Sequence, residues 1–339
     1  MKAAFDYIAG TGGVGTGILF KLLGAHDLGR NESRLAELTD ARDFCKLHII
    51  LHYAAKLLRG AVPVYPIGRV GADDSGRALL ADMAAAGMDT RFMTADSALR
   101  TMYSVCFQYP NGEGGNLTAS NSACDAVCAA DIDRFFDSGA AAGRGMLLAA
   151  PEVPLDARAH LLARGRANGC TNAASLLSGE AAEFLARGLF SDIDLLAVNR
   201  DEAAAILTAA GEPFTDGSLA DICIAYLRGR FPHMDILVTL GHDGALACTA
   251  DGTARVPAFP ATPVNTAGAG DCFLGTALAC LACGLPLADA ARLAALAAGV
   301  KVLCGETIDF ALDAERLQAE AAARGWHPGS AAHGFLSGA

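Results

Sequence analysis

Short apolar runs alternate along the chain with longer stretches in which apolar positions recur at helical spacing. The runs that resemble β-strands cover residues 62–67, 145–150, 193–198 and 235–240. The stretches with helical spacing cover residues 74–86, 155–168 and 201–209. Strands that alternate with helices favour an α/β fold with a doubly wound, mostly parallel sheet flanked by helices.

Two segments depart from this alternation. Residues 101–109 and 116–120 are rich in β-forming side chains and flank Pro110-Asn111-Gly112. That tripeptide is typical of turns, so the segment predicts a hairpin. The polar stretch 26–43 shows no clear strand pattern, and we expect a loop or an inserted helix there.

Composition and charge exclude several classes of protein. The 339 residues are 53% hydrophobic, which is enough for a sizeable core. The formal net charge is −11 and no cluster of Lys or Arg appears, so we expect no nucleic-acid partner. The chain opens without a recognisable secretory signal, and the most apolar stretch, 273–287, is too short to cross a membrane. We therefore expect a cytoplasmic protein with no membrane partner.

The chain has eleven cysteines, which raises the question of a metal site. Cys280 and Cys283 form C-x-x-C, and Cys124 and Cys128 form C-x-x-x-C, but the remaining cysteines are scattered. A structural zinc site needs two close pairs of ligands on turns. Cysteine in an apolar helix acts as a small hydrophobic residue. We therefore expect reduced thiols and no zinc.

A glycine pattern near the start suggests a dinucleotide site. Gly10, Gly12 and Gly15 fit G-x-G-x-x-G after an apolar run. A dinucleotide fold also needs an acidic residue about 20 residues later, at the end of a second strand, and no such strand is evident. No G-K-[ST] follows either, which excludes a Walker A loop. We interpret the glycines instead as places where a substrate or lid backbone comes close, with Gly12 and Gly13 as candidate substrate contacts.

The sequence VNTAGAGDCFLG at residues 264–275 carries the strongest chemical signal. Gly268-Ala269-Gly270 stands just before an apolar helix, where free amides and the helix dipole can hold an anion. Asp271 begins that helix. Its carboxylate can cap backbone amides, or it can accept a proton from a hydroxyl that attacks beside the anion hole. The spacing alone leaves both roles open.

This segment resembles D-T-x-G-A-G-D-x-F-x-G, the signature of the ribokinase-like (PfkB) carbohydrate kinase family. Three further segments resemble family motifs. They are the G-x-x-G-x-D-x-x-G region at 66–90, the N-x-x-E in VNRDEA at 198–203, and LVTLGHDGALA at 237–247. The four matches follow the family's order and spacing and cover most of residues 60–305.

The resemblance implies ATP-dependent phosphorylation of a hydroxyl on a sugar or sugar-like substrate. Asp271 would be the catalytic base, and the amides of Gly268, Ala269 and Gly270 would hold the charge of the transferred phosphoryl group. Thr239, Gly241, Gly244 and Thr266 would lie against the nucleotide.

The resemblance also implies a Mg²⁺ site. Asn199 and Glu202 would orient the ion, largely through water. The same two residues fit a helix capping box, and they could do both jobs.

The substrate side departs from the family pattern. Gly15 stands near the place where the family commonly has a substrate-binding Asp, and the family's G-G-x-x-x-N is missing from the helix expected at 43–58. Lys46, His48 or His52 could face the substrate, although a histidine on an apolar helix is more often a core residue. Arg30 and Asn31, in a very polar stretch, are candidate substrate contacts.

A further departure concerns a monovalent cation. In many relatives the first Asp of the signature helps a loop to hold K⁺ beside the anion hole, but this chain has Asn265 there. A neutral oxygen attracts a cation less than a carboxylate does, so we expect K⁺ dependence to be weakened.

These observations predict one ribokinase-like kinase domain over residues 1–325, with a C-terminal tail at 326–339. A small β-rich lid, with parts near 12–42 and 101–120, would close over the substrate. Lid edges often pair in this family, so a homodimer is compatible with the sequence. Two alternatives stay open: a nucleoside kinase of the same fold, and a non-catalytic relative that binds a nucleotide or a sugar.

Overall fold

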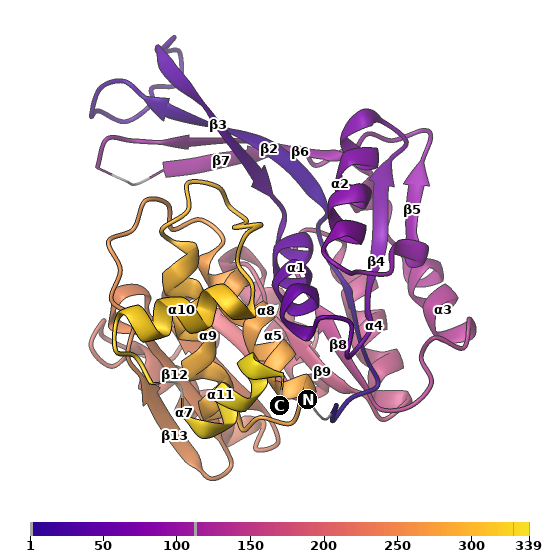
Figure 1. Ribbon diagram of the computed structural model, residues 1–339. Coiled ribbons are helices and arrows are strands. Elements are labelled where there is room, and N and C mark those ends of the chain that lie inside the picture. Colours follow the sequence, from indigo (N-terminus) through magenta and orange to yellow (C-terminus); the bar gives the residue numbers. More distant parts are fainter. Residues whose placement is uncertain (1–2, 112–113, 328, 339) are drawn as a thin grey trace.

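The computed structural model describes residues 3–111, 114–327 and 329–338 (Figure 1). Its main element is a nine-stranded sheet, and the strands in spatial order are β13 (Gly252–Val256), β12 (Ala245–Thr249), β11 (Asp235–Thr239), β10 (Leu195–Asn199), β9 (Thr171–Ala174), β8 (Gly145–Ala149), β1 (Tyr7–Thr11), β4 (Val64–Gly71) and β5 (Met93–Asp96). Neighbouring strands from β11 to β5 pair in parallel, whereas β12 pairs antiparallel with both β11 and β13. The predicted α/β class with a mostly parallel sheet is confirmed.

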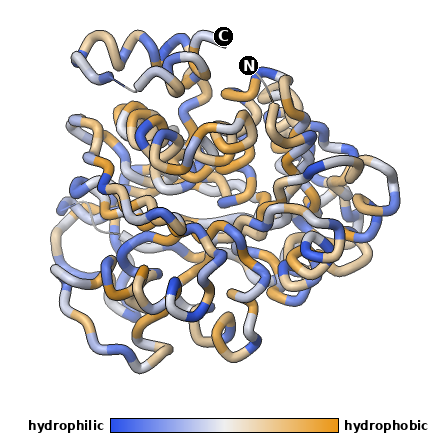
Figure 2. Tube along the Cα trace, turned by 90° about the horizontal axis from the view of Figure 1, so that it is seen from below, coloured by the Kyte–Doolittle hydropathy of each residue, from blue (hydrophilic) through white to orange (hydrophobic). Residues whose placement is uncertain are grey.

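Helices cover both faces of this sheet. They are α1 (Lys46–Leu58), α2 (Asp74–Ala85), α3 (Ala129–Asp137), α4 (Leu155–Ala167), α5 (Ala181–Ala186), α6 (Arg200–Ala210), α7 (Leu219–Arg230), α8 (Ala269–Ala282), α9 (Leu287–Lys301), α10 (Ala314–Ala323) and α11 (Ser330–Ser337). Successive strand residues point to opposite faces. Leu195 and Ala197 of β10 therefore join the core under α1, α8 and α9, while Leu196 and Val198 join the core under α4, α6 and α7. In Figure 2 the apolar stretches gather inside and the polar ones follow the outer loops.

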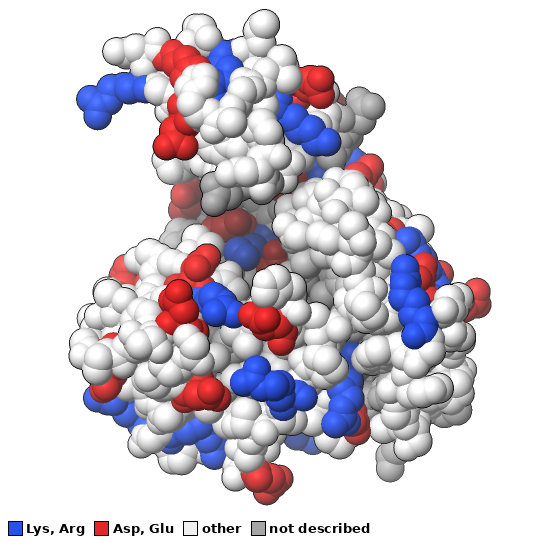
Figure 3. Space-filling model, turned by 90° about the vertical axis from the view of Figure 1, so that its left-hand side faces the viewer, with Lys and Arg blue, Asp and Glu red and all other residues white. Residues whose placement is uncertain are grey.

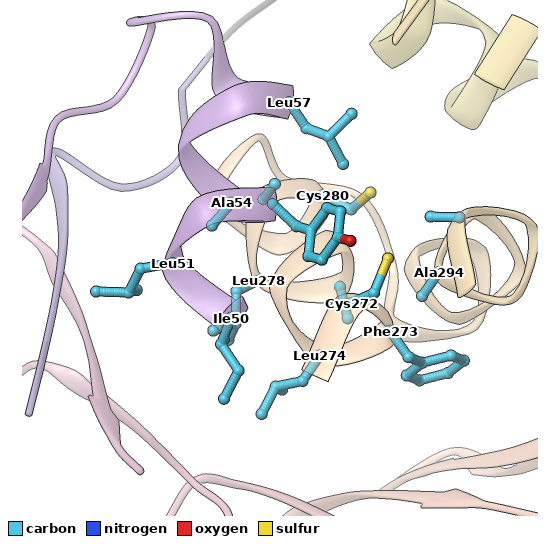
Figure 4. Packing of buried hydrophobic residues seen from close by; sticks show 14 of the residues in the cluster. Ile50, Leu51, Ala54, Leu57, Cys272, Phe273, Leu274, Leu278, Cys280 and Ala294 are labelled. Atoms are coloured by element: carbon cyan, nitrogen blue, oxygen red, sulfur yellow. The ribbon is translucent and has the colours of Figure 1, made fainter. Parts of the chain in front are cut away.

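The packing of α1 against α8 positions the ends of both helices (Figure 4). Ile50, Ala54 and Leu57 of α1 pack with Leu274 and Leu278 of α8. Gly275 permits the close approach, because a Cβ there would lie 2.2 Å from the carbonyl oxygen of Ile50. Two helices that pack this closely bring their first residues near each other, on the side where the sheet's parallel strands end.

A smaller sheet stands away from the main body at the place predicted for the lid, and we call it the lid below (Figure 1). Its strands, in spatial order, are β3 (Ala36–Phe44), β2 (Gly15–Leu22), β6 (Met102–Gln108) and β7 (Gly114–Thr118). The predicted hairpin is confirmed as the antiparallel pair β6–β7. Gly112 of its predicted turn lies outside the described residues.

The loop expected within residues 26–43 extends only to residue 35, and the expectation is wrong for the rest, because Ala36–Phe44 is a strand. The strand pairs antiparallel with β2, and most of its described side chains are exposed or only partly buried. Backbone hydrogen bonds to β2 hold it, so its sequence lacks the apolar alternation that would have revealed it. The helix expected from residue 43 begins only at Lys46, because the strand extends to Phe44.

The glycines of G-x-G-x-x-G do not open a helix. Gly10 lies in β1 and Gly15 is the first residue of β2, so the segment passes directly from the main sheet into the lid. A dinucleotide site would need a helix N-terminus at this turn. The geometry agrees with the rejection of an NAD site.

The C-terminal segment, predicted as a tail over 326–339, packs on the core. Ala332, Phe335 and Leu336 of α11 are buried, and Arg59 donates hydrogen bonds to the carbonyl oxygens of Phe335 and Leu336. An apolar face of a single short helix is enough to attach this segment. Within the described residues, no helix has the length and apolar character that crossing a bilayer requires.

Candidate active site

The turn before α8 has the geometry of an anion-binding helix start. Gly268 is the N-cap and has φ 76°, and a Cβ there would lie 2.4 Å from the carbonyl oxygen of Thr307. Only glycine suits both conditions. The Ala269 amide donates to the carbonyl oxygen of Thr266 at 3.1 Å. Gly270 and Asp271 belong to the first turn, where backbone amides have no intrahelical acceptor.

Asp271 faces a lysine from another helix. The Nζ of Lys46, the first residue of α1, lies 3.4 Å from Oδ1 of Asp271. The negative charge of Asp271 raises the pKa of Lys46, so this ammonium stays protonated at any physiological pH. The site therefore pairs a carboxylate with a fixed cation at the positive end of a helix.

The two histidines of α1 do not face this site. His48 and His52 are buried in the core, where they pack against Phe44, Phe310 and Tyr53. Burial lowers the pKa of His48 to about 3 and that of His52 to about 4. Of the three α1 residues that the sequence left as candidates, the structure brings only Lys46 to Asp271.

Glu152 is a second carboxylate that the sequence did not reveal. It follows the carboxyl end of β8 with φ 72°, and its Oε2 accepts a hydrogen bond from the Lys46 amide at 2.9 Å. Burial raises its pKa to about 7. Gly13 allows this placement, because a Cβ there would lie 2.4 Å from Oε2 of Glu152. The space beside Gly12 is filled in the same way, by Ala150. Both glycines, predicted as substrate contacts, thus border the chain's own atoms.

The Glu152→Gln variant should change stability in a pH-dependent way. Because the folded-state pKa of Glu152 lies above its ordinary value of 4.5, its contribution to stability is complete below pH 4.5 and is lost as the pH rises towards 7. Glutamine resembles the protonated form at every pH. The variant should therefore gain melting temperature relative to wild type at pH 8 but not at pH 4.5.

Thermal unfolding at the two pH values checks this expectation. Glu315→Gln, at an exposed position of α10, is the matched control and should show no such pH dependence. A difference between Glu152→Gln and wild type that is the same at both pH values would contradict the assignment.

The predicted Mg²⁺ residues form a capping box at the start of α6. The Glu202 amide donates to Oδ1 of Asn199 at 2.9 Å, and the Asn199 amide donates to Oε2 of Glu202 at 2.8 Å. Glu202 is only 7% exposed, and burial raises its pKa to about 6. The charges of Lys46 and Asp271 also act on it. The capping role is therefore present, and the carboxylate also lies within electrostatic reach of Asp271.

Three of the four predicted nucleotide residues lie at the end of the strand next to this capping box or in the turn that follows, whereas Thr266 lies in the loop before α8. Strand pairing sets Thr239, the last residue of β11, next to Asn199. Gly241 and Gly244 follow with φ 60° and 88°. A hollow of ≈ 270 Å³ opens here, lined by Arg200, Leu240, Asp243, Arg255 and the first residues of α7.

A cleft of ≈ 270 Å³ separates the lid from the main body. Lid residues Leu19, Lys21, Thr39 and Gln108 form one wall, and Val264, Asn265, Gly305 and Glu306 form the other. Figure 3 shows the hollow between the two parts, with acidic and basic side chains visible inside it. The cleft borders the loop that leads into the turn at 268–270, the predicted anion hole.

Comparison with known proteins decides the family. A model described as pfkB family carbohydrate kinase matches residues 50–314, well over half of the chain. The chain belongs to the pfkB family of carbohydrate kinases. The matched range contains α8, the capping box and the β11–β12 turn. Residues 1–49, with β2, β3 and Lys46, lie outside it.

Curated relatives of this PfkB-family chain match over parts of their length. The bifunctional protein HldE of Acidiphilium cryptum is 34% identical over 33% of this chain and 23% of its own. The 2-dehydro-3-deoxygalactonokinase of Haloferax volcanii is 28% identical over 50% of this chain and 53% of its own. The chain thus spans less than a quarter of the first relative and about half of the second.

Solved structures share the PfkB fold over nearly the whole chain. Ribokinase from Cryptococcus neoformans in complex with ADP has a TM-score of 0.78 and 22% identity, and the match covers 93% of this chain and 99% of that one. A nucleoside kinase from Burkholderia thailandensis in complex with inosine has a TM-score of 0.75 and 19% identity, covering 94% and 98%. At these identities the likeness shows the fold.

Two predicted substrate residues lie far from the PfkB motifs. Arg30 and Asn31 are exposed in the loop between β2 and β3. β2 starts beside the site and runs for eight residues, about 26 Å at 3.3 Å per residue, before that loop begins. The structure does not bring this pair to Asp271.

A different acid joins the lid to the main body. Oδ2 of Asp43 accepts a hydrogen bond from Ser104 of β6 at 2.7 Å, and Oδ1 accepts one from Thr307 at 3.1 Å. Its charge also helps to raise the pKa of Glu152. Asp43 was hidden from the sequence because its place depends on β3, the strand that had no apolar signal.

Proposed function

We propose that the protein transfers the γ-phosphoryl group of ATP to a hydroxyl of a sugar or sugar-like substrate. The observation that carries this proposal is the placement of the Asp271 carboxylate on the first turn of α8, beside Gly268 and 3.4 Å from the Lys46 ammonium. A base, an anion-binding helix start and a fixed cation are what phosphoryl transfer needs from a protein.

In this proposal Asp271 accepts the proton of the attacking hydroxyl. Lys46 offers N–H donors towards the reacting oxygens. The amides at the start of α8 hold negative charge on the phosphoryl group, and one donor of this kind is worth about 2.7–4 kcal/mol in the transition state. The lid excludes water, so the phosphoryl group reaches the substrate rather than a water molecule.

The residues at the start of α6 fit a Mg²⁺ ion held through water. Glu202 is a buried carboxylate with a raised pKa, which a nearby cation would favour in its charged form. Asn199 adds an amide oxygen, and both are the hard ligands that Mg²⁺ prefers. When bound, the ion would neutralise charge on the nucleotide phosphates.

Glu202→Gln should shift Mg²⁺ activation to higher concentration, because it removes a charge that holds the water shell of the ion. Asp201→Asn, one residue earlier and exposed, is the matched control. Initial rates against Mg²⁺ concentration at saturating ATP measure the shift. An activation curve that coincides with that of Asp201→Asn would leave Glu202 as a capping residue only.

The substrate class is the finer part of the proposal. The relatives and structural neighbours include a 2-dehydro-3-deoxygalactonokinase, ribokinases and a nucleoside kinase bound to inosine. The cleft under the lid offers polar side chains from Lys21, Thr39, Gln108 and Asn265, which suits a ligand with several hydroxyl groups. We place a sugar or sugar acid first and a nucleoside second.

ADP release from ATP across a panel of sugars, sugar acids and nucleosides tests the proposal. Stimulation by a sugar or sugar acid supports it, and stimulation by nucleosides alone replaces it with the nucleoside kinase. ADP binding without turnover on any member of the panel would favour the non-catalytic relative.

Homodimerisation through the lid stays a prediction, as does a cytoplasmic location. The lid exposes several large apolar side chains, among them Leu35 at 80% and Leu117 at 71%. Apolar side chains concentrated on a small sheet are typical of a surface that another chain covers.

A further inference from the structure

Lys301 places a buried positive charge behind the anion-binding turn. It is the last residue of α9 and is 0% exposed. Its Nζ donates one hydrogen bond to the carbonyl oxygen of Asn265 at 3.1 Å and another to the carbonyl oxygen of Ala267. Burial lowers its pKa. Asp309, one of the acids whose charge reaches Lys301, is paired with Arg316 at 2.8 Å. The ammonium is thus held by backbone carbonyls.

Those carbonyls belong to the loop that enters the anion-binding turn. Nδ2 of Asn265 donates to the carbonyl oxygen of Gly305 at 2.8 Å, and its Oδ1 accepts from the Ala267 amide at 2.9 Å. The Val264 amide donates to the carbonyl oxygen of Val302 at 2.7 Å. The loop is therefore fixed between the end of α9 and Gly268, and the Lys301 ammonium lies inside it.

The residues here do not fit the monovalent cation that the family resemblance implies. A cation held by this loop would draw on backbone carbonyls, and those of Asn265 and Ala267 already accept from Nζ of Lys301. A second positive charge beside the ammonium would be repelled at short range. Asn265, a neutral residue in the place of the family's Asp, adds no charge to compensate.

We propose that the Lys301 ammonium serves as a built-in cation that orients the 265–267 carbonyls, and through them the amides at 268–271, without K⁺. One fixed ammonium supplies the single positive charge of one bound ion, and the backbone carbonyls of Asn265 and Ala267 hold it without a carboxylate at position 265. Lys301 is a positioning residue, because it acts through the loop and does not touch the substrate. The effect on turnover rests on the proposed kinase function, but the occupancy of the loop by the ammonium does not.

Two substitutions at position 301 test the proposal. Lys301→Ala removes the ammonium and leaves room for an ion, whereas Lys301→Met removes the charge but keeps most of the side-chain volume. In tetramethylammonium chloride the alanine variant should lose about 10²-fold in kcat, as expected when a reacting group is misplaced by about 1 Å. KCl or NH₄Cl at matched ionic strength should restore it. The methionine variant should not be restored.

Thermal unfolding gives a readout that does not need kinase activity. KCl should raise the melting temperature of Lys301→Ala relative to tetramethylammonium chloride by mass action, and it should leave wild type unchanged. Leu296→Ala, a buried position of α9 away from the loop, is the control for simple loss of packing and should show no response to K⁺.

Each outcome decides the proposal. A wild type whose stability or turnover requires K⁺ would overturn it, and this measurement remains available even where a variant fails to fold. An alanine variant that folds but shows no response of its melting temperature to K⁺ or NH₄⁺ would also overturn it. If K⁺ stabilises the alanine variant while no substrate is phosphorylated, the built-in cation stands and the proposed function fails.

Discussion

Replacing Asp271 by asparagine is expected to lower kcat by about 10²–10⁴-fold while leaving nucleotide binding intact. Asparagine keeps the shape and capping ability of the side chain, but it cannot take a proton from the attacking hydroxyl. Lys46, 3.4 Å away, would still have a hydrogen-bond acceptor, so the site should stay folded. Steady-state kinetics on the active substrate measure the loss, and the melting-temperature shift by ADP·Mg²⁺ reports binding.

The matched control for Asp271→Asn is Asp289→Asn. Asp289 is also an acid in the first turn of a helix, α9, where it pairs with Arg292 on the surface. The loss of a charge at the start of a helix should by itself lower the kcat of Asp289→Asn only slightly. If the two variants behave alike and both keep near wild-type kcat, Asp271 is a cap and not a base.

Replacing Lys46 by methionine is expected to move the acidic limb of the pH–rate profile upward, because the charge of Lys46 lowers the pKa of Glu202, the proposed Mg²⁺ residue, and this effect is lost in the variant. The ammonium is the positive charge that acts on both Asp271 and Glu202. Without it, the carboxylate of Glu202 stays protonated to higher pH. At neutral pH the variant should also lose turnover, because the N–H donors are gone.

Lys56→Met is the control on the same helix, since Lys56 lies in the last turn of α1 and Lys46 in the first. Its profile should coincide with that of wild type. The measurement is kcat/KM against pH for both variants, with the ADP-induced shift in melting temperature followed at each pH. If the acidic limb of the Lys46→Met profile coincides with that of wild type, Lys46 does not act on the groups whose ionisation controls turnover.

The sequence predicted central strands of the main sheet because these strands are buried on both faces. Runs such as 145–150 and 235–240 are mostly apolar, and they correspond to β8 and β11 within one residue. The strand β3 was missed because exposed side chains and backbone pairing leave no such pattern. The packing of α11 was missed because three buried residues in a short helix make a weak signal.

In the candidate site, too, residues that are neighbours in the sequence could be predicted, and residues that only tertiary packing brings together could not. Gly268, Ala269, Gly270 and Asp271 are contiguous in the sequence, so their shared place at the start of α8 could be predicted. Lys46 and Glu152 come from two other elements, and only the packing of α1 against α8 and the course of the chain after β8 bring them together. Lys301 is likewise separated by 34 residues from the carbonyl that it holds at Ala267.

The central claim is that the phosphoryl group goes to a substrate hydroxyl and not to water. ³¹P NMR of a reaction containing ATP, Mg²⁺ and the most active member of the panel tests it directly. The account predicts a new phosphomonoester signal equal in amount to the ADP formed, and its loss with Asp271→Asn. Release of inorganic phosphate alone, or a phosphomonoester formed equally well by Asp271→Asn, would contradict it.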